Sequence, residues 1–317
     1  MNHTVSKNQV NFYTASESDE NQRLDNLLAK VLKGVPKSYI YRIIRSGEVR
    51  VNKKRQEASY KVAIGDILRI PPVSVKTQVE VEKFIPKSVF PILFEDDYFL
   101  IINKPDGVAC HGGSGISFGV IEQLRQNYPE YKFLELAHRL DRDTSGILIL
   151  AKKRSALVGL QALMRAGKVR KHYLAMTNGV WSKPQQSVKA ALTAYVTKDG
   201  ERRVRVDAED GQFSHTDFRV IQRYTGHDGE YTLVEAILHT GRTHQIRVHL
   251  QHLGHAILGD SKYGDFERNK DLVKYGLKRM FLHASFMEFI HPITEEKLQV
   301  KCELPPNLQK FVDYLDH

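Results

Sequence analysis

The chain has 317 residues, of which 41% are hydrophobic and 26% charged, a balance typical of a globular protein with a sizeable core. No apolar run approaches the length of about 20 residues that a membrane-spanning helix needs, and the polar N-terminus lacks the apolar stretch of a secretory signal. We therefore expect a cytoplasmic protein with no membrane partner, and the net charge of +10 favours an acidic partner such as nucleic acid.

The N-terminal part of the chain predicts a tail followed by a compact basic domain. Residues 1–19 are polar and predict a flexible tail. A helix is then indicated by apolar residues at helical spacing, Leu24, Leu27, Leu28, Val31 and Leu32. A second short helix is predicted from Ser38, as its N-cap, to Gly47, and the runs EVRVN and DILRI predict strands.

Charge is concentrated in this domain, which we place at residues 20–72. It holds 12 basic and 5 acidic residues, an excess that suits a phosphate backbone. The stretch RLDNLLAKVLKGVPKSYIYRIIRSGEVRVNKKR, followed by AIGDILRI, resembles the S4-like RNA-binding domain. The resemblance implies that seven basic residues face RNA: Lys37, Arg42, Arg45, Arg50, Lys53, Lys54 and Arg55. The alternative for any one of them is a solvated surface position.

A proline-flanked linker is predicted at residues 73–89, and a second domain at residues 90–317. Strands are indicated by the apolar runs LFEDDYFLIINKP, GILILAKK, KHYLAMT and YTLVEAILHT. Helices are indicated after GILILAKK and from Thr243 onward. Because strands and helices do not alternate regularly, the predicted fold class is α+β, with a mixed, largely antiparallel sheet.

The segment HRLDRDTSG, from His138 to Gly146, is the richest in chemistry. It places Asp141 between two arginines, directly before an apolar strand. Nearby positive charge favours the ionised carboxylate, which can then act as nucleophile or base. A salt-bridged turn with no catalytic role explains the same residues, and composition alone leaves both interpretations open.

This segment resembles the signature of the RluA family of pseudouridine synthases. Two further stretches in the same order, KHYLA and TGRTHQIRVHLQHLGHAILGD, are similar to later family segments. The resemblance implies that Asp141 is the catalytic carboxylate, that Tyr173 is the active-site tyrosine, and that Arg247 pairs with the carboxylate. It also implies that Arg139 contacts RNA by filling the space of a base that has been flipped out.

The resemblance further implies a substrate and a reaction. Within the family the chain is most similar to enzymes of large-subunit (23S) ribosomal RNA, so we expect an enzyme that converts uridines in that RNA to pseudouridine. Nothing in the sequence demands more than a monomer, and a monomer is expected. The reaction requires neither cofactor nor metal, and none is expected. Two alternatives remain: the same chemistry on tRNA or another rRNA site, and a non-catalytic RNA-binding factor of ribosome assembly.

Other motifs give weaker signals. The stretch HGGSG misses both the dinucleotide-binding and the nucleophile-elbow patterns, so a flexible loop is expected. His249 and His252 can share a helix face, but no carboxylate or cysteine nearby completes a metal site. Asp96 and Asp97 are interpreted as an ordinary turn rather than a two-metal centre. Cys110 and Cys302 belong to no CxxC pair, which argues against structural zinc.

Overall fold

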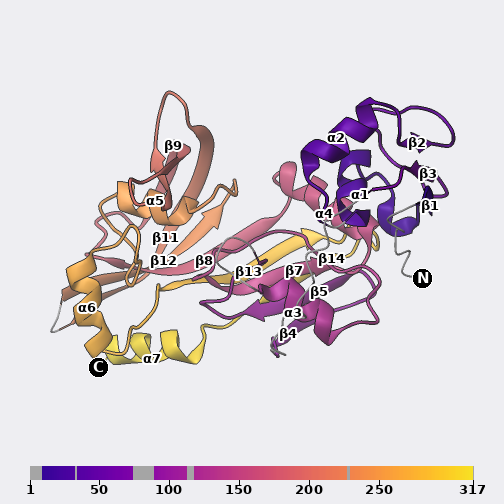
Figure 1. The fold of residues 1–317 in the computed structure, drawn as a ribbon. Helices are drawn as coiled ribbons and strands as arrows, with labels where there is room; N and C mark the ends of the chain where they lie inside the picture. The colour runs from indigo at the N-terminus through magenta and orange to yellow at the C-terminus, as the bar shows by residue number, and fades with distance from the viewer. Residues whose placement is uncertain (1–8, 33, 74–88, 113–117, 227–228, 317) are drawn as a thin grey trace. The chain divides into compact units, whose positions relative to one another are not determined.

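The computed structural model describes residues 9–32, 34–73, 89–112, 118–226 and 229–316 (Figure 1). The chain divides into two compact units, residues 1–85 and 86–317. Most of the predicted linker and residues 113–115 of the predicted flexible loop lie outside the described residues. Within the described ranges, no helix combines the length and apolar character that crossing a membrane requires.

The first unit packs two helices against a small antiparallel sheet of strand order β1-β3-β2. The helices are α1 (Leu24–Val31) and α2 (Lys37–Arg45), and the strands are β1 (Asn11–Thr14), β2 (Arg50–Val51) and β3 (Ile67–Ile70). The apolar faces predicted for the helices form the core, since Leu24, Leu27, Leu28, Ile40 and Ile43 are all buried. The helix α2 starts after Pro36, so Ser38 lies inside the helix rather than capping it.

Residues 11–19 differ from the predicted tail. The strand β1 pairs with β3, and a 3-10 turn, η1 (Glu17–Asp19), follows it. The Asp19 carboxylate is fully buried and accepts hydrogen bonds from Tyr13 at 2.7 Å, from Ser16 and from Lys30 at 3.2 Å. Composition misled the prediction because these polar side chains bond to one another instead of to water.

The second unit is built on an 11-stranded sheet whose path runs β10-β9-β11-β12-β8-β13-β7-β5-β4, with β14 beside β13 and β6 beside β7. Its strands are β4 (Ile92–Glu95), β5 (Phe99–Lys104), β6 (Glu135–Leu136), β7 (Ser145–Ala151), β8 (Arg170–Asn178), β9 (Gln185–Val196), β10 (Arg202–Val206), β11 (Gln212–Gly226), β12 (Gly229–Leu238), β13 (Leu282–Ile290) and β14 (Lys297–Lys301). Of the described strand pairs, β7 with β13 is parallel and the others are antiparallel. The prediction of an α+β fold with a mixed, largely antiparallel sheet is confirmed.

Helices cover parts of this sheet: α3 (Val120–Asn127), α4 (Arg154–Arg165), α5 (Gln245–His252), α6 (Phe266–Lys274) and α7 (Pro306–Leu315). All seven residues of β7 are buried, as its continuous apolar run indicated. The helix α4 packs on β7, and α5 packs on β9, β10 and β11. Figure 1 shows α5 beside β9 and β11. The predicted start of α5 at Thr243 is two residues early, because His244 before it has a left-handed backbone.

One glycine allows the close approach of β7 and β13. Gly146 has φ of +110°, and a Cβ atom there would lie 2.2 Å from the carbonyl oxygen of Ala284. A larger residue would separate the strands immediately after the Asp141 loop. The glycine of HRLDRDTSG is thus required by packing.

Candidate active site

Asp141 lies in the loop that connects β6 to β7. The N–H of Thr144 donates to the carbonyl oxygen of Asp141 at 3.2 Å, and this turn returns the chain to the sheet at Ser145. The side chain of Asp141 is 25% exposed, so its carboxylate is accessible from solvent. The loop therefore presents this acid group instead of burying it.

A buried lysine holds the loop in place. Lys104, at the end of β5, is fully buried, and its ammonium donates to the carbonyl oxygens of Pro105 and Val108 at 2.7 Å and of Arg142 at 3.0 Å. Burial lowers the pKa of Lys104 to about 8, and the three carbonyl oxygens replace the water that the cation has lost. Because Arg142 directly follows Asp141, Lys104 fixes the backbone beside the carboxylate.

Arg247 on α5 joins two carboxylates. Its Nε and Nη2 donate to the two oxygens of Asp260 at 2.7 and 2.8 Å, and its Nη1 donates to Oδ2 of Asp141 at 3.3 Å. Burial alone would raise the pKa of Asp260, but Arg247 and the backbone N–H groups of Lys262 and Tyr263 lower it overall. The bidentate pair with Asp260 fixes the guanidinium plane and leaves Nη1 to donate to Asp141.

His244 is a second neighbour of Asp141. Its Nδ1 lies 2.7 Å from the Tyr263 hydroxyl, and its Nε2 lies 3.8 Å from Oδ2 of Asp141. The Tyr263 oxygen also accepts the N–H of Val204 at 2.8 Å. In the tautomer in which the Tyr263 hydroxyl donates to Nδ1, the histidine proton lies on Nε2. Burial lowers the pKa of His244, which favours the neutral ring, and in this tautomer its N–H faces the carboxylate.

Tyr173 enters the same pocket from β8. Its partners across the sheet are Ala236 on β12 and Ala284 on β13, so small side chains flank its ring on both sides. Burial, assisted by the charge of Asp141, raises the pKa of Tyr173. The phenol therefore keeps its proton at neutral pH, and the ring offers a flat apolar surface.

These groups surround a pocket of about 640 Å³, formed by residues of the second unit. Asp141 is the acidic residue that lines it. The basic residues that line it are Arg139, Arg165, Lys171, Arg242 and Arg247. One carboxylate among cations is an arrangement that suits an anionic, phosphate-bearing substrate.

The structure places the predicted RNA-binding residues in two groups. Arg139 is exposed and lines the pocket beside Asp141. The other seven, Lys37, Arg42, Arg45, Arg50, Lys53, Lys54 and Arg55, are exposed on α2 and the segment from β2 to residue 55 in the first unit. Among the residues that the structure describes, none of these seven forms an ion pair. Their charges are thus available to phosphates.

The histidines of α5 do not form a metal site together. His249 is fully buried, with Nε2 at 2.8 Å from Ser214 Oγ and Nδ1 at 2.9 Å from Thr216 Oγ1, whereas His252 is exposed. The predicted turn at Asp96 is present, since its Oδ1 accepts the N–H groups of Tyr98 and Phe99. Both motifs have structural explanations.

Three residues around Asp141 were missed by the sequence reasoning: Lys104, His244 and Asp260. A usable signal existed for Lys104, because a lysine that ends a buried apolar strand needs carbonyl acceptors. Likewise, an arginine on the apolar side of a helix needs an acidic partner, and Asp260 is the first acidic residue after Arg247. The approach of His244 to Asp141 had no local signal, because it depends on the fold.

Comparison with known proteins gives two family matches and near full-length relatives. Residues 98–252 match the RNA pseudouridylate synthase family, and residues 22–68 match the S4 domain. Ribosomal large subunit pseudouridine synthase C of Haemophilus influenzae is 48% identical over 320 residues, which cover 99% of this chain and 98% of that protein. The protein of the same name from Escherichia coli K12 is 48% identical over 313 residues, covering 96% and 97%.

Solved structures give the same result. Human RNA pseudouridylate synthase domain containing 1 has 27% sequence identity and a TM-score of 0.59, covering 71% of this chain and 89% of that one. Human RNA pseudouridylate synthase domain containing 4 has 28% identity and a TM-score of 0.56, covering 71% and 93%. The resemblance stated from the sequence is confirmed, and the chain belongs to the RNA pseudouridylate synthase family.

Proposed function

We propose that this chain converts specific uridines of large-subunit (23S) ribosomal RNA to pseudouridine, with Asp141 as the catalytic carboxylate. The reaction breaks the bond between uracil N1 and the ribose and rejoins the base through C5. C5 gives up its proton and N1 finishes with one, so atoms and electrons balance without an added group. Side chains that bind, orient and transfer protons are sufficient for this balance.

The contact between Asp141 and Arg247 is the observation that supports the proposal most strongly. They are 106 residues apart in sequence, yet Arg247 Nη1 lies 3.3 Å from Asp141 Oδ2 in a pocket lined by cations. Asp260 holds Arg247 from the other side, so the guanidinium orients Asp141 instead of turning away. A carboxylate oriented in this way can act on the sugar or on the base of a nucleotide that enters the pocket.

The remaining lining residues take supporting roles. A target uridine must first leave its stack, at a cost of a few kcal/mol. The ring of Tyr173 then provides a surface on which uracil stacks, while Arg139 fills the space that the base leaves in the RNA. The Nε2 proton of His244 faces Asp141, and we assign His244 to positioning the carboxylate.

Two observations support the choice of RNA. The relatives described above are named as synthases of the ribosomal large subunit. The seven predicted RNA-binding residues of the first unit are exposed and have no acidic partner among the described residues, which suits a long structured RNA. Each proposed catalytic group comes from one chain, so a monomer is sufficient. We propose that this monomer acts in the cytoplasm.

Release of tritium from RNA labelled at uracil C5 tests this proposal. We expect the purified protein to release tritium from large-subunit rRNA transcripts but not from tRNA transcripts. Mapping pseudouridines in cells that lack the gene should show large-subunit sites that have lost the modification. No release from any RNA would support the non-catalytic alternative, and loss confined to tRNA would overturn the choice of substrate.

A further inference from the structure

A second cluster of titratable side chains lies on the sheet, outside the groups assigned to catalysis. His215 and Asp217 are two residues apart on β11, so they point to the same face of the sheet. His239 directly follows β12, and its N–H donates to the carbonyl oxygen of His215 at 3.2 Å. Strand pairing therefore brings the three side chains together.

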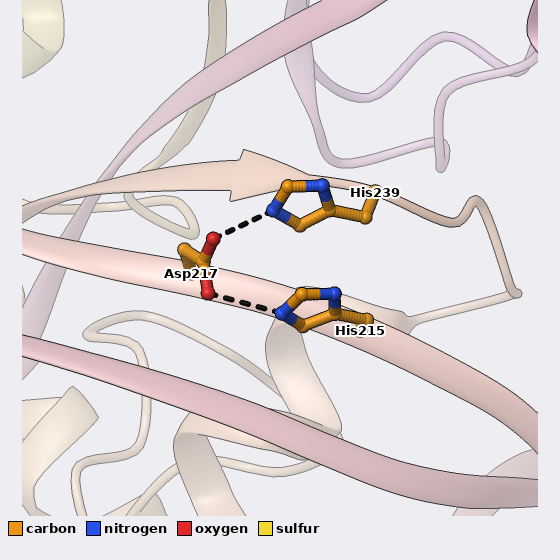
Figure 2. Close-up of side chains that lie close together, drawn as sticks. All are labelled: His215, Asp217 and His239. Atoms are coloured by element: carbon orange, nitrogen blue, oxygen red, sulfur yellow. Dashed lines mark hydrogen bonds and ion pairs between the residues drawn. The ribbon is translucent and has the colours of Figure 1, made fainter. Parts of the chain in front are cut away.

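Figure 2 shows the Asp217 carboxylate pointing toward both imidazole rings. Its Oδ1 lies 3.0 Å from Nε2 of His215, and its Oδ2 lies 2.6 Å from Nε2 of His239. The rings are nearly parallel, with centroids 4.1 Å apart. One nitrogen or oxygen from each of the three residues lies within 4.8 Å of the others.

The backbone that carries this cluster is held on both sides. The N–H of His215 donates to Thr240 Oγ1 at 2.9 Å, and its carbonyl oxygen accepts Nε2 of Gln245 at 3.0 Å. These bonds connect β11 to the segment between β12 and α5. Ligand groups on a fixed backbone lose little conformational freedom when an ion binds, which favours binding.

We propose that His215, Asp217 and His239 bind a first-row divalent metal ion, with Zn²⁺ as the best match. Two imidazole nitrogens and a carboxylate oxygen form a ligand set that such ions accept. Bonds of about 2.0–2.2 Å place the ligand atoms of a tetrahedral zinc site about 3.3–3.6 Å apart. The present spacings of 3.0 and 2.6 Å are shorter than that, so the side chains must move apart as an ion replaces the two hydrogen bonds. The ion must also displace Ser187, whose Oγ lies 2.9 Å from Nε2 of His215.

Exposure and charge define the kind of site. The side chains of Asp217 and His239 are 40% and 46% exposed, so an ion can enter, and water can occupy the fourth position. Lys189 on β9 pairs with His215 across the sheet, and its positive charge opposes a cation. We therefore expect reversible occupancy by one ion. His239 also lines the catalytic pocket, but the metal site does not depend on the roles proposed there.

Titration of the chelator-treated, untagged full-length chain with Zn²⁺ tests the site, using calorimetry together with metal analysis of the dialysed protein. We expect one ion per chain. His215→Ala and His239→Ala should each weaken binding by more than about tenfold, and Asp217→Asn should weaken it as well. The matched control is His252→Ala, which removes an exposed histidine outside the cluster and should bind as the unchanged protein does.

Anomalous diffraction at the zinc edge from a Zn²⁺-soaked crystal of the unchanged chain gives a second measurement that needs no variant. A peak between the three side chains supports the site. The proposal is overturned if the peak lies elsewhere, if no ion binds, or if the histidine variants bind Zn²⁺ as tightly as the control. Because none of these readouts uses RNA, failure here leaves the catalytic proposal unaffected.

Discussion

The pocket and the basic surface of the first unit use positive charge in opposite ways. In the pocket, Arg247 is 3% exposed and bonded to two carboxylates. On α2, Arg42 and Arg45 are exposed and form no ion pair with any described residue. A buried, paired guanidinium acts through fixed geometry, whereas exposed cations act through their number and the counterions that they displace. Substitutions in the two regions should therefore affect different measurements.

The largest effect is expected where a buried pair is broken. Asp260→Ala leaves Arg247 without its bidentate partner, which should destabilise the fold by about 3–5 kcal/mol and reduce tritium release. Urea unfolding measures the first effect. Asp271→Ala is the matched control, because Asp271 pairs with Lys274 on the surface of α6. The urea midpoint of this variant should hardly differ from that of the unchanged protein. Equal urea midpoints for the two variants would contradict the view that the buried pair of Arg247 and Asp260 fixes the geometry of the pocket.

Next in size is the positioning role of His244. His244→Ala should lower kcat by about tenfold to a hundredfold with little change in KM, because Asp141 loses a neighbour that orients it. His244→Gln keeps an N–H donor and should recover part of the rate. The thermal midpoint of each variant separates this loss from misfolding. An unchanged kcat in the alanine variant, or equal losses in both variants, would argue against positioning.

The two units should lose stability in different ranges of pH. Burial lowers the pKa values of His249 and His283 in the second unit to about 4, so the folded state favours their neutral rings. Between about pH 6.5 and pH 4 the unfolded chain binds more protons at these sites, so stability falls as pH falls, by about 1.4 kcal/mol per pH unit for each histidine.

The first unit should respond at lower pH. Hydrogen bonding from Arg23 lowers the pKa of Asp25 to about 2 against burial that would raise it, so its contribution is lost only as pH falls from about 3.8 toward 2. Hydrogen exchange resolved by residue, from pH 7 to 4, measures both units. If the amides of both units lost protection from exchange at the same pH, the expected difference between the units would be contradicted.

The smallest effect is expected on the basic surface. The double variant Arg42→Ala, Arg45→Ala should leave folding intact and reduce the slope of log affinity for rRNA against log salt by about 2. Lys270→Ala with Lys274→Ala is the control, because it removes the same charge from two lysines that pair with Glu267 and Asp271. Identical slopes for the two double variants would remove α2 from the RNA interface.

Local sequence patterns predicted many of the helices and strands, but they predicted few of the contacts between residues far apart in the sequence. The helices α1 and α2 follow from apolar periodicity, and the strands β5, β7 and β8 follow from apolar runs. The strand β1 was missed because its polar neighbours bond to one another. Asp141 and Arg247 were singled out through family resemblance, not from composition, and their contact depends on segments 106 residues apart.

The same limit applies to Lys104 and to the cluster of His215, Asp217 and His239. Lys104 contacts the carbonyl oxygen of Arg142, 38 residues away, and His239 reaches Asp217 only because β11 pairs with β12. Periodicity shows which face of an element is buried but not which element lies beside it. Partners across strands therefore become visible only in the structure.

The most direct test of the account compares Asp141→Asn with Asp143→Asn, two substitutions of the same kind in one loop. Asp143 pairs with Arg142 at 3.0 Å, and we assign it no catalytic role. Asp141→Asn should lower tritium release from large-subunit rRNA by about a thousandfold or more with rRNA affinity unchanged, and Asp143→Asn should release tritium near the wild-type rate. Turnover by Asp141→Asn near the wild-type rate, or an equal loss in both variants, would contradict the assignment of Asp141 as the catalytic carboxylate.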